Sequence, residues 1–255
     1  MISKEAEQLK SFFVENDFKA IFTEDGFEAY MEECKRNGID EIEVERFGKS
    51  MDSLIIYIPG GAYSGEPMEG HFKLAERLSE KAEVMFIRHP ALPEHTVTDV
   101  FDDILELYEE AGREYEKVYL MGDSSGGGLA LALAEAAKEK PSKVILISPW
   151  LDVSLSDPEI ENKEDPILEP YGLRRIGKMW AGELSLTDYR VSPIYGSLDG
   201  LDITIFCGTD ELLYTDILKL KDRCDIHVAE GMFHAYPVFD VPEAEDTIKE
   251  ILELL

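Results

Sequence analysis

The sequence predicts an α/β fold: a mostly parallel central sheet with helices on both faces, in one domain that spans residues 1–255. From residue 42 onward, short apolar runs alternate with segments of helical periodicity, which is the pattern of parallel strands joined by helices. The length of 255 residues suits one large α/β domain, and a hydrophobic fraction of 44% can supply its core. No internal repeat or low-complexity tract argues for another architecture.

The strands of this sheet are expected at seven short apolar runs. Each run is followed, after a turn or a helical segment, by the next one along the chain. The expected strands are Ile42–Phe47, Leu54–Ile58, Val84–Ile87, Val118–Met121, Val144–Ser148, Ile203–Cys207 and Ile226–Ala229.

Helices are expected where apolar residues recur with a period near 3.6. The last such segment, Pro242–Leu255, carries Ile248, Ile251, Leu252 and Leu255 at the i, i+3, i+4, i+7 spacing of a packed amphipathic helix, so it should close the sheet. Residues 1–40 and 151–190 break the alternation and are expected as helical additions outside the sheet. The other expected helices are Glu69–Lys81, Thr96–Glu114, Ser124–Lys140 and Asp216–Arg223.

The charge excludes several classes of partner. Lys and Arg number 25 against 54 Asp and Glu, so the net charge is 25 − 54 = −29. Such a surface repels phosphate backbones and anionic lipids, and no basic block offsets it, so neither nucleic acid nor a membrane is an expected partner. The charge itself fits a solvated surface and points to no particular function.

The cysteines and the N-terminus indicate the expected compartment. Cys34, Cys207 and Cys224 are an odd number and lack metal-ligand spacing, so we expect reduced thiols, with no disulfide framework and no zinc site. The first residues have no apolar signal core, and no apolar run approaches the 18 residues of a membrane helix. A cytoplasmic protein is therefore expected.

A nucleophile motif stands between an expected strand and an Ala/Leu-rich helix. Residues 122–126 read G-D-S-S-G and fit G-x-S-x-G, in which small residues flank the serine because the sharp turn brings backbone segments together. The register selects Ser124 over Ser125, which would require a glycine where Asp123 stands. The alternative is a glycine-rich turn before a packed helix.

A serine nucleophile needs a base and an acid that orients the base. In an α/β fold of this kind the acid and then the histidine follow the serine along the chain. Each of the two should lie just after the C-terminal end of a strand. His234 is the better base, because the other histidine that follows the candidate acid, His227, lies inside an expected strand. Asp210 is the preferred acid because it comes first after its strand. Glu211 and Asp216 are the alternatives.

Acyl transfer also needs N–H donors for the oxyanion. One candidate is the N–H group of Ser125, directly after the nucleophile. The loop after Leu54–Ile58 reads P-G-G-A-Y, so the N–H groups of Gly61 and Ala62 are the other candidates. Taken alone, this glycine pair is equally consistent with an ordinary tight turn.

These motifs together resemble the hormone-sensitive-lipase-like branch of the α/β-hydrolases, a family that includes many bacterial carboxylesterases. Residues 122–127 are similar to the family's G-D-S-A-G-G, and residues 208–212 to its G-x-x-D-x-L acid motif. Pro93-Glu94-His95, the run of residues 147–152 and Ser192-Pro193 are also family-like. One position departs: Pro59 stands where the family's H-G-G-G begins with histidine. The resemblance implies the α/β-hydrolase fold, with residues 1–40 and 151–190 in the places of the family's helical cap.

The residues and the resemblance together predict a serine carboxylesterase that cleaves small to medium acyl esters. Ser124 attacks, His234 moves the proton, Asp210 orients His234, and Gly61, Ala62 and Ser125 hold the oxyanion, without a cofactor or a metal. Two alternatives stay open: an amidase, arylformamidase or peptidase with the same triad, and a receptor for small molecules that has lost the chemistry. Both a monomer and a homodimer are consistent with the sequence. Candidate residues of an apolar substrate pocket are Tyr63, Trp150, Tyr171, Met179 and Trp180.

Overall fold

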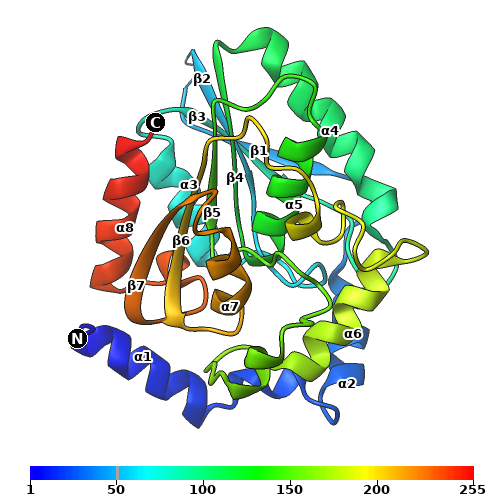
Figure 1. Ribbon diagram of the computed structural model, residues 1–255, viewed down its shortest axis with the longest axis vertical. Coiled ribbons are helices and arrows are strands. Elements are labelled where there is room, and N and C mark those ends of the chain that lie inside the picture. Colours follow the sequence, from blue (N-terminus) through cyan, green and yellow to red (C-terminus); the bar gives the residue numbers. More distant parts are fainter. Residues whose placement is uncertain (50–51) are drawn as a thin grey trace.

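The computed structural model describes residues 1–49 and 52–255. Within them, seven strands form one sheet in the order β1-β3-β2-β4-β5-β6-β7 (Figure 1). β1 pairs antiparallel with β3, and all other neighbours are parallel. The predicted α/β class is confirmed, and all seven expected strands are present. Their bounds are β1 Glu43–Phe47, β2 Ser53–Ile58, β3 Glu83–Arg88, β4 Lys117–Asp123, β5 Lys143–Ile147, β6 Ile203–Asp210 and β7 Asp225–Phe233.

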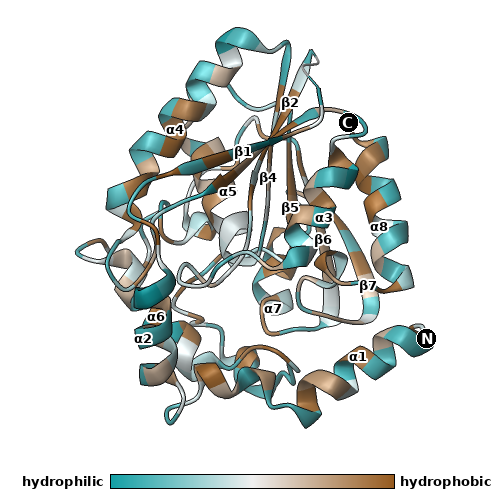
Figure 2. Cartoon of the chain, turned by 180° about the vertical axis from the view of Figure 1, so that it is seen from behind, coloured by the Kyte–Doolittle hydropathy of each residue, from teal (hydrophilic) through white to brown (hydrophobic). Residues whose placement is uncertain are grey.

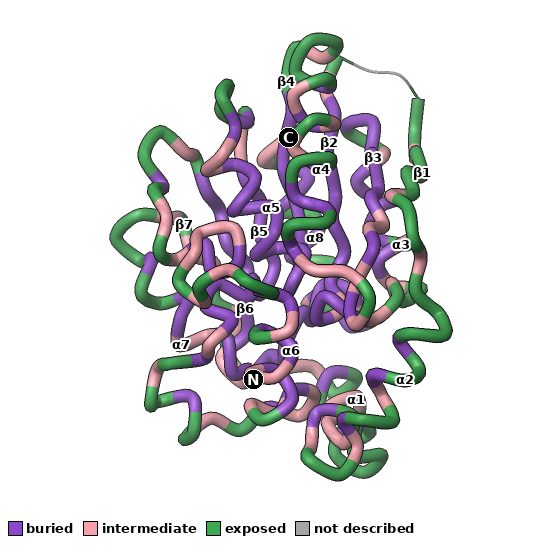
Figure 3. Tube along the Cα trace, turned by 90° about the vertical axis from the view of Figure 1, so that its right-hand side faces the viewer, coloured by how far each residue is buried: buried purple, intermediate pink, exposed green. Residues whose placement is uncertain are grey.

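Helices cover both faces of this sheet. Because side chains alternate along a strand, Leu54 and Ile56 of β2 join the core beneath α4 and α5, while Ile55 and Tyr57 join the core beneath α3 and α8. Figure 3 shows the central strands buried and the edge strand β1 exposed. The helices are α1 Lys4–Glu15, α2 Phe27–Asn37, α3 Glu69–Leu78, α4 Val97–Glu114, α5 Ser124–Ala136, α6 Pro170–Ala181, α7 Tyr214–Ile217 and α8 Pro242–Glu253.

The sequence of α4 shows why a helix forms on the sheet surface. Thr96 precedes the helix, and its N–H and hydroxyl groups both donate to Asp99 Oδ2, at 2.7 and 2.8 Å, in the first turn. Val97, Val100, Phe101, Ile104, Tyr108 and Ala111 are buried at helical spacing. The resulting alternation of apolar and polar bands along α4 is visible in Figure 2. By contrast, the Ala/Leu-rich α5 is buried almost all round.

The two cap segments, defined as residues 1–40 and 151–190, gather at one end of the molecule (Figure 1). The first contains α1, the 3₁₀ helix η1 Phe18–Phe22 and α2, and the second contains η2 Pro158–Asn162 and α6. They pack on each other closely: a Cβ at Gly172 of α6 would lie 2.6 Å from Cα of Phe22. Among the residues described, no helix combines the length and apolarity needed to cross a membrane.

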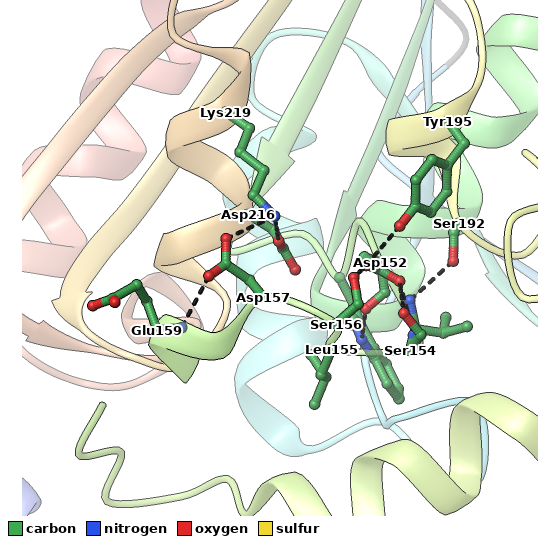
Figure 4. Close-up of polar contacts among 12 residues, drawn as sticks. Asp152, Ser154, Leu155, Ser156, Asp157, Glu159, Ser192, Tyr195, Asp216 and Lys219 are labelled. Atoms are coloured by element: carbon green, nitrogen blue, oxygen red, sulfur yellow. Dashed lines mark hydrogen bonds and ion pairs between the residues drawn. The ribbon is translucent and has the colours of Figure 1, made fainter. Parts of the chain in front are cut away.

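A buried carboxylate anchors the second cap segment where it leaves β5. Asp152 Oδ1 accepts hydrogen bonds from the N–H and hydroxyl groups of Ser154, at 2.9 and 2.5 Å, and Oδ2 accepts from Ser156 (2.7 Å) and Tyr195 (3.0 Å). Figure 4 shows this cluster beside the Asp157–Lys219–Asp216 ion pairs. Since Asp152 is only 1% exposed, these bonds replace those it would make to water.

Candidate active site

The nucleophile motif forms the sharp turn that its glycines predict. Ser124 follows the last residue of β4, begins α5, and has φ +51°, a left-handed value that is strained for a serine. A Cβ at Gly122 would lie 2.4 Å from the carbonyl oxygen of Gly126, and a Cβ at Gly126 would lie 2.1 Å from that of Ile58. The turn therefore closes only with glycine at both positions.

Three side chains from separate loops meet at this turn. Ser124 Oγ lies 2.8 Å from His234 Nε2, and His234 Nδ1 lies 2.7 Å from Glu211 Oε2. The other carboxylate oxygen of Glu211 accepts the N–H of Gly208 at 3.2 Å, which fixes the orientation of the carboxylate. His234 is 5% exposed and Glu211 is fully buried. This hydroxyl, imidazole and carboxylate have the relative geometry of a nucleophile, its base and the group that orients the base.

The prediction that Asp210 contacts His234 is wrong. β6 continues three residues beyond its predicted end and includes Asp210, which pairs with Phe233 of β7 after a register irregularity. Glu211 is therefore the first residue after the strand. Asp210 instead forms a 2.6 Å ion pair with Lys10, and its side chain is 41% exposed. The other alternative, Asp216, pairs with Lys219.

Burial and neighbouring charge act in opposite directions on His234. Burial lowers the pKa of the imidazole, but the hydrogen bond and charge of Glu211, together with the charges of Asp165 and Asp123, outweigh it. The pKa of His234 is thus raised above its ordinary value of 6.5. This environment stabilises an imidazolium, the form that a general base reaches when it takes a proton from serine.

The loop after β2 is held by a buried carboxylate next to the nucleophile. Asp123 Oδ1 accepts hydrogen bonds from the N–H of Gly60 (3.0 Å) and the hydroxyl of Tyr57 (2.8 Å), and Oδ2 contacts His71 Nε2 at 3.1 Å. Burial raises the pKa of Asp123, yet the contacts with His71, Tyr57 and Gly60 outweigh it and hold the pKa below 3.8. The ionised carboxylate fixes Gly60 against the turn that carries Ser124.

The three predicted oxyanion donors come from the loop after β2 and from the first turn of α5. Gly61 and Ala62 line the same cavity as Ser124, and Ala62 has a left-handed φ of +52°. Ser125 lies in the first turn of α5, where backbone N–H groups have no partner within the helix. In residues 1–49 and 52–255, the N–H groups of Gly61 and Ala62 make no hydrogen bond to a protein acceptor.

Ser124 and His234 open into a cavity of about 300 Å³ with a mainly apolar wall. Both cap segments contribute to this wall, as do the loops after β5 and β6. Representative lining residues are Phe18, Ile21, Leu168, Leu173, Trp150 and Leu213.

Most of the predicted pocket residues lie elsewhere. Trp150 lines the cavity, as expected. Tyr63 and Trp180 are buried and stack on each other with ring centroids 4.3 Å apart, because two large flat rings fill the core more completely in contact. Tyr171 lies 37% exposed on the surface of α6, and Met179 packs against the main core. Tyr63 lines a neighbouring pocket together with Gly61 and Ser125, whereas Tyr171, Met179 and Trp180 are absent from the wall of the Ser124 cavity.

Sequence reasoning missed the residues that the cap brings to the site. Phe18 and Ile21 lie in a segment that was expected only to be helical, and Asp165 belongs to no recognisable sequence motif. Their proximity to Ser124 depends on how the cap segments fold over the sheet, which local periodicity does not encode. Among the described residues no group of three or more His, Cys, Asp or Glu side chains is placed to hold a metal ion.

A hydroxyl, an imidazole and a carboxylate in buried contact at the carboxyl ends of parallel strands are typical of hydrolases, and the comparisons with known proteins agree. Residues 55–238 match the model of the alpha/beta hydrolase fold family. The chain belongs to this family.

Individual relatives within this family carry esterase names. An esterase of Acinetobacter venetianus is 29% identical over 226 residues, 80% of this chain and 75% of the relative. A carboxylesterase/phospholipase of Mycobacterium tuberculosis is 26% identical over 78% of this chain and 60% of the relative. A solved esterase from the bacterial hormone-sensitive lipase family superposes with a TM-score of 0.82, at 22% identity, over 99% of this chain and 97% of the neighbour. The predicted α/β-hydrolase family and the esterase class are confirmed.

Proposed function

We propose that this protein is a serine carboxylesterase that cleaves neutral esters of small to medium acyl groups through an acyl-enzyme. The observation that carries the proposal is the contact of Ser124 with His234 at 2.8 Å, with Glu211 2.7 Å behind the imidazole, at the floor of an apolar cavity. Esterase names among the relatives support the same chemistry.

Each side chain of the array has a defined step. His234 Nε2 accepts the Ser124 proton as Oγ bonds to the ester carbonyl carbon, and the tetrahedral intermediate forms. Glu211 holds Nδ1–H and stabilises the imidazolium. The imidazolium then donates its proton to the departing alcohol, which leaves the acyl group on Ser124. Water, deprotonated by His234, attacks the acyl carbon and releases the acid and the free serine.

The negative charge that develops on the carbonyl oxygen needs donors that are already in place. The N–H groups of Gly61, Ala62 and Ser125 are suited to this role, because each borders Ser124 and the first two make no hydrogen bond to a protein acceptor in the described part of the chain. Loss of one such donor typically costs about 10²- to 10³-fold in rate.

The cavity favours an apolar, uncharged substrate. Its wall is mostly aliphatic and aromatic, and its two acidic residues are paired, Asp123 with His71 and Glu66 with Arg88. An anionic substrate would find no free cation among these pairs and would approach a chain with a net charge of −29. Neutral esters avoid that repulsion.

Hydrolysis of p-nitrophenyl acetate, butyrate and octanoate tests the proposal. We expect turnover by the wild-type protein and its loss in Ser124→Ala and His234→Ala, while both variants keep the wild-type circular dichroism. The matching anilides separate an amidase from an esterase. A wild-type protein that binds these esters without hydrolysing them would instead favour a receptor.

A further inference from the structure

The segment between η2 and α6 lies against the loop that carries Glu211. Its Asp165 is 5% exposed. Oδ1 accepts hydrogen bonds from the N–H groups of Ile167 (2.8 Å) and Leu168 (2.9 Å), while Oδ2 accepts the N–H of Leu212 at 2.9 Å. One buried carboxylate thus joins a cap segment to the residue that directly follows Glu211.

The two ends of this connection serve different parts of the site. Ile167 and Leu168 line the cavity above Ser124. Leu212 is covalently adjacent to Glu211, whose carboxylate orients His234. A shift of Asp165 would therefore move a wall of the cavity and the imidazole's partner together.

Two lysines from the cap contact the ends of β6 and β7, next to the loop that carries Glu211. Lys10 Nζ donates to Asp210 Oδ2 and to the carbonyl oxygen of Gly231, at 2.6 and 3.0 Å. Lys163 Nζ lies 3.5 Å from the carbonyl oxygen of Thr209. Partly exposed ion pairs contribute little to stability, whereas a buried carboxylate with three N–H donors is costly to disturb. Asp165 is the principal connection.

Asp165 also acts on His234 through its charge. The negative groups that face the imidazole are Glu211 from the loop after β6, Asp165 from the cap and Asp123 from β4, and each raises the pKa of His234. The pKa of Asp165 itself is raised by burial, and the charge of His234 and the three N–H donors offset only part of that rise.

We propose that Asp165 is a positioning residue for the hydrolysis: it ties the cap segment to the loop of Glu211 and, through the N–H of Leu212, holds Glu211 against His234. This inference rests on the proposed esterase function. It assigns the cap segment a part in the chemistry in addition to its place in the cavity wall.

The replacement Asp165→Asn separates the two ends of the connection. Its single oxygen can serve either Ile167 and Leu168 or Leu212, and the amide nitrogen then faces the remaining N–H group. Because small misplacements of catalytic groups cost up to about 100-fold, we expect kcat for p-nitrophenyl butyrate to fall roughly 10- to 100-fold. The matched control is Asp157→Asn, a cap carboxylate that accepts the N–H of Glu159 at 2.9 Å and pairs with Lys219. It should stay within twofold of wild type.

A purely structural role would not move the titration of His234. With one negative neighbour removed, the imidazolium is less stable, so the acid limb of kcat/KM should shift to lower pH in Asp165→Asn and stay unchanged in Asp157→Asn. NMR titration of the His234 Cε1–H signal in the full-length protein measures the same shift without turnover. Wild-type kinetics and an unshifted titration in Asp165→Asn would overturn the proposal.

A second variant tests the same role of Asp165 in case Asp165→Asn does not fold. Asp165→Ser keeps a hydroxyl that can accept from Ile167 or Leu168, and removes both the charge and the Leu212 contact. It should show the same shift of the His234 titration. If neither variant folds, Asp165 is a folding residue and the positioning role is overturned. A wild-type protein without esterase activity would contradict the proposed function instead, and the NMR titration would still decide the effect of the Asp165 charge.

Discussion

Exchange of the acid Glu211 for its amide is the sharpest test of how the site is assembled. In Glu211→Gln, one oxygen cannot accept both His234 Nδ1–H and the N–H of Gly208, which now bond to separate carboxylate oxygens at 2.7 and 3.2 Å. If the oxygen stays on Gly208, the amide NH₂ group meets Nδ1–H, and the imidazole is driven to the tautomer that cannot accept the Ser124 proton. Loss of the orienting carboxylate in such arrays costs about 10⁴-fold in kcat, so we expect a fall of roughly 10³- to 10⁴-fold.

The neighbouring residue supplies the control. Asp210→Asn removes the ion pair between Asp210 and Lys10. The Asp210 side chain is 41% exposed, and such exposed pairs contribute about 0–1 kcal/mol to stability. We therefore expect kcat to change by less than about threefold. Both variants are assayed with p-nitrophenyl butyrate, and urea unfolding verifies that both are folded. Equal activity losses in the two variants, or a larger loss in Asp210→Asn, would refute the assignment of Glu211.

Three further outcomes follow from the same contacts. Because the pKa of His234 is raised above 6.5, the imidazole stays protonated to higher pH than a free one, so kcat/KM should fall as the pH drops through a midpoint above 6.5; a midpoint below 6.5 in a pH–rate profile would contradict this. Asp152→Ala leaves the Ser154 N–H and three hydroxyl groups without their acceptor and should lower the free energy of unfolding in urea by about 3 kcal/mol, whereas Asp188→Ala, which removes a partly exposed pair with Arg190, should cost under about 1 kcal/mol. Leu173→Phe adds volume to the cavity wall and should lower kcat/KM for p-nitrophenyl octanoate about tenfold relative to the acetate; an unchanged ratio would place the acyl chain elsewhere.

The sheet could be predicted because its signals are local. The apolar runs from Leu54 to Ile58 and from Val144 to Ser148 are buried on both faces, as strands of a parallel sheet between helices must be. The turn at Ser124 was also encoded locally, since only glycine fits at positions 122 and 126. These features need no knowledge of distant contacts.

The acid was misassigned because the end of β6 is set by its neighbour. β7 continues to Phe233 and pairs with Asp210 across a register irregularity, which extends β6 past its predicted end at Cys207. Successive strand residues point to opposite sides, so a shift of one position exchanges the side chain that meets His234. The fully buried Glu211 and the half-exposed Asp210 are adjacent, and their roles depend on the pairing partner alone.

The loop after β2 shows how a site can keep its geometry when one motif residue differs. The family's histidine is replaced by Pro59, which has no N–H group and no imidazole. Here the next residue, Gly60, is fixed by Asp123, and Asp123 is in turn held by Tyr57 and His71 from two other elements. The loop is therefore restrained by Asp123, the residue directly before Ser124. This hydrogen bond fixes the start of the segment that contains Gly61 and Ala62 without an imidazole at position 59.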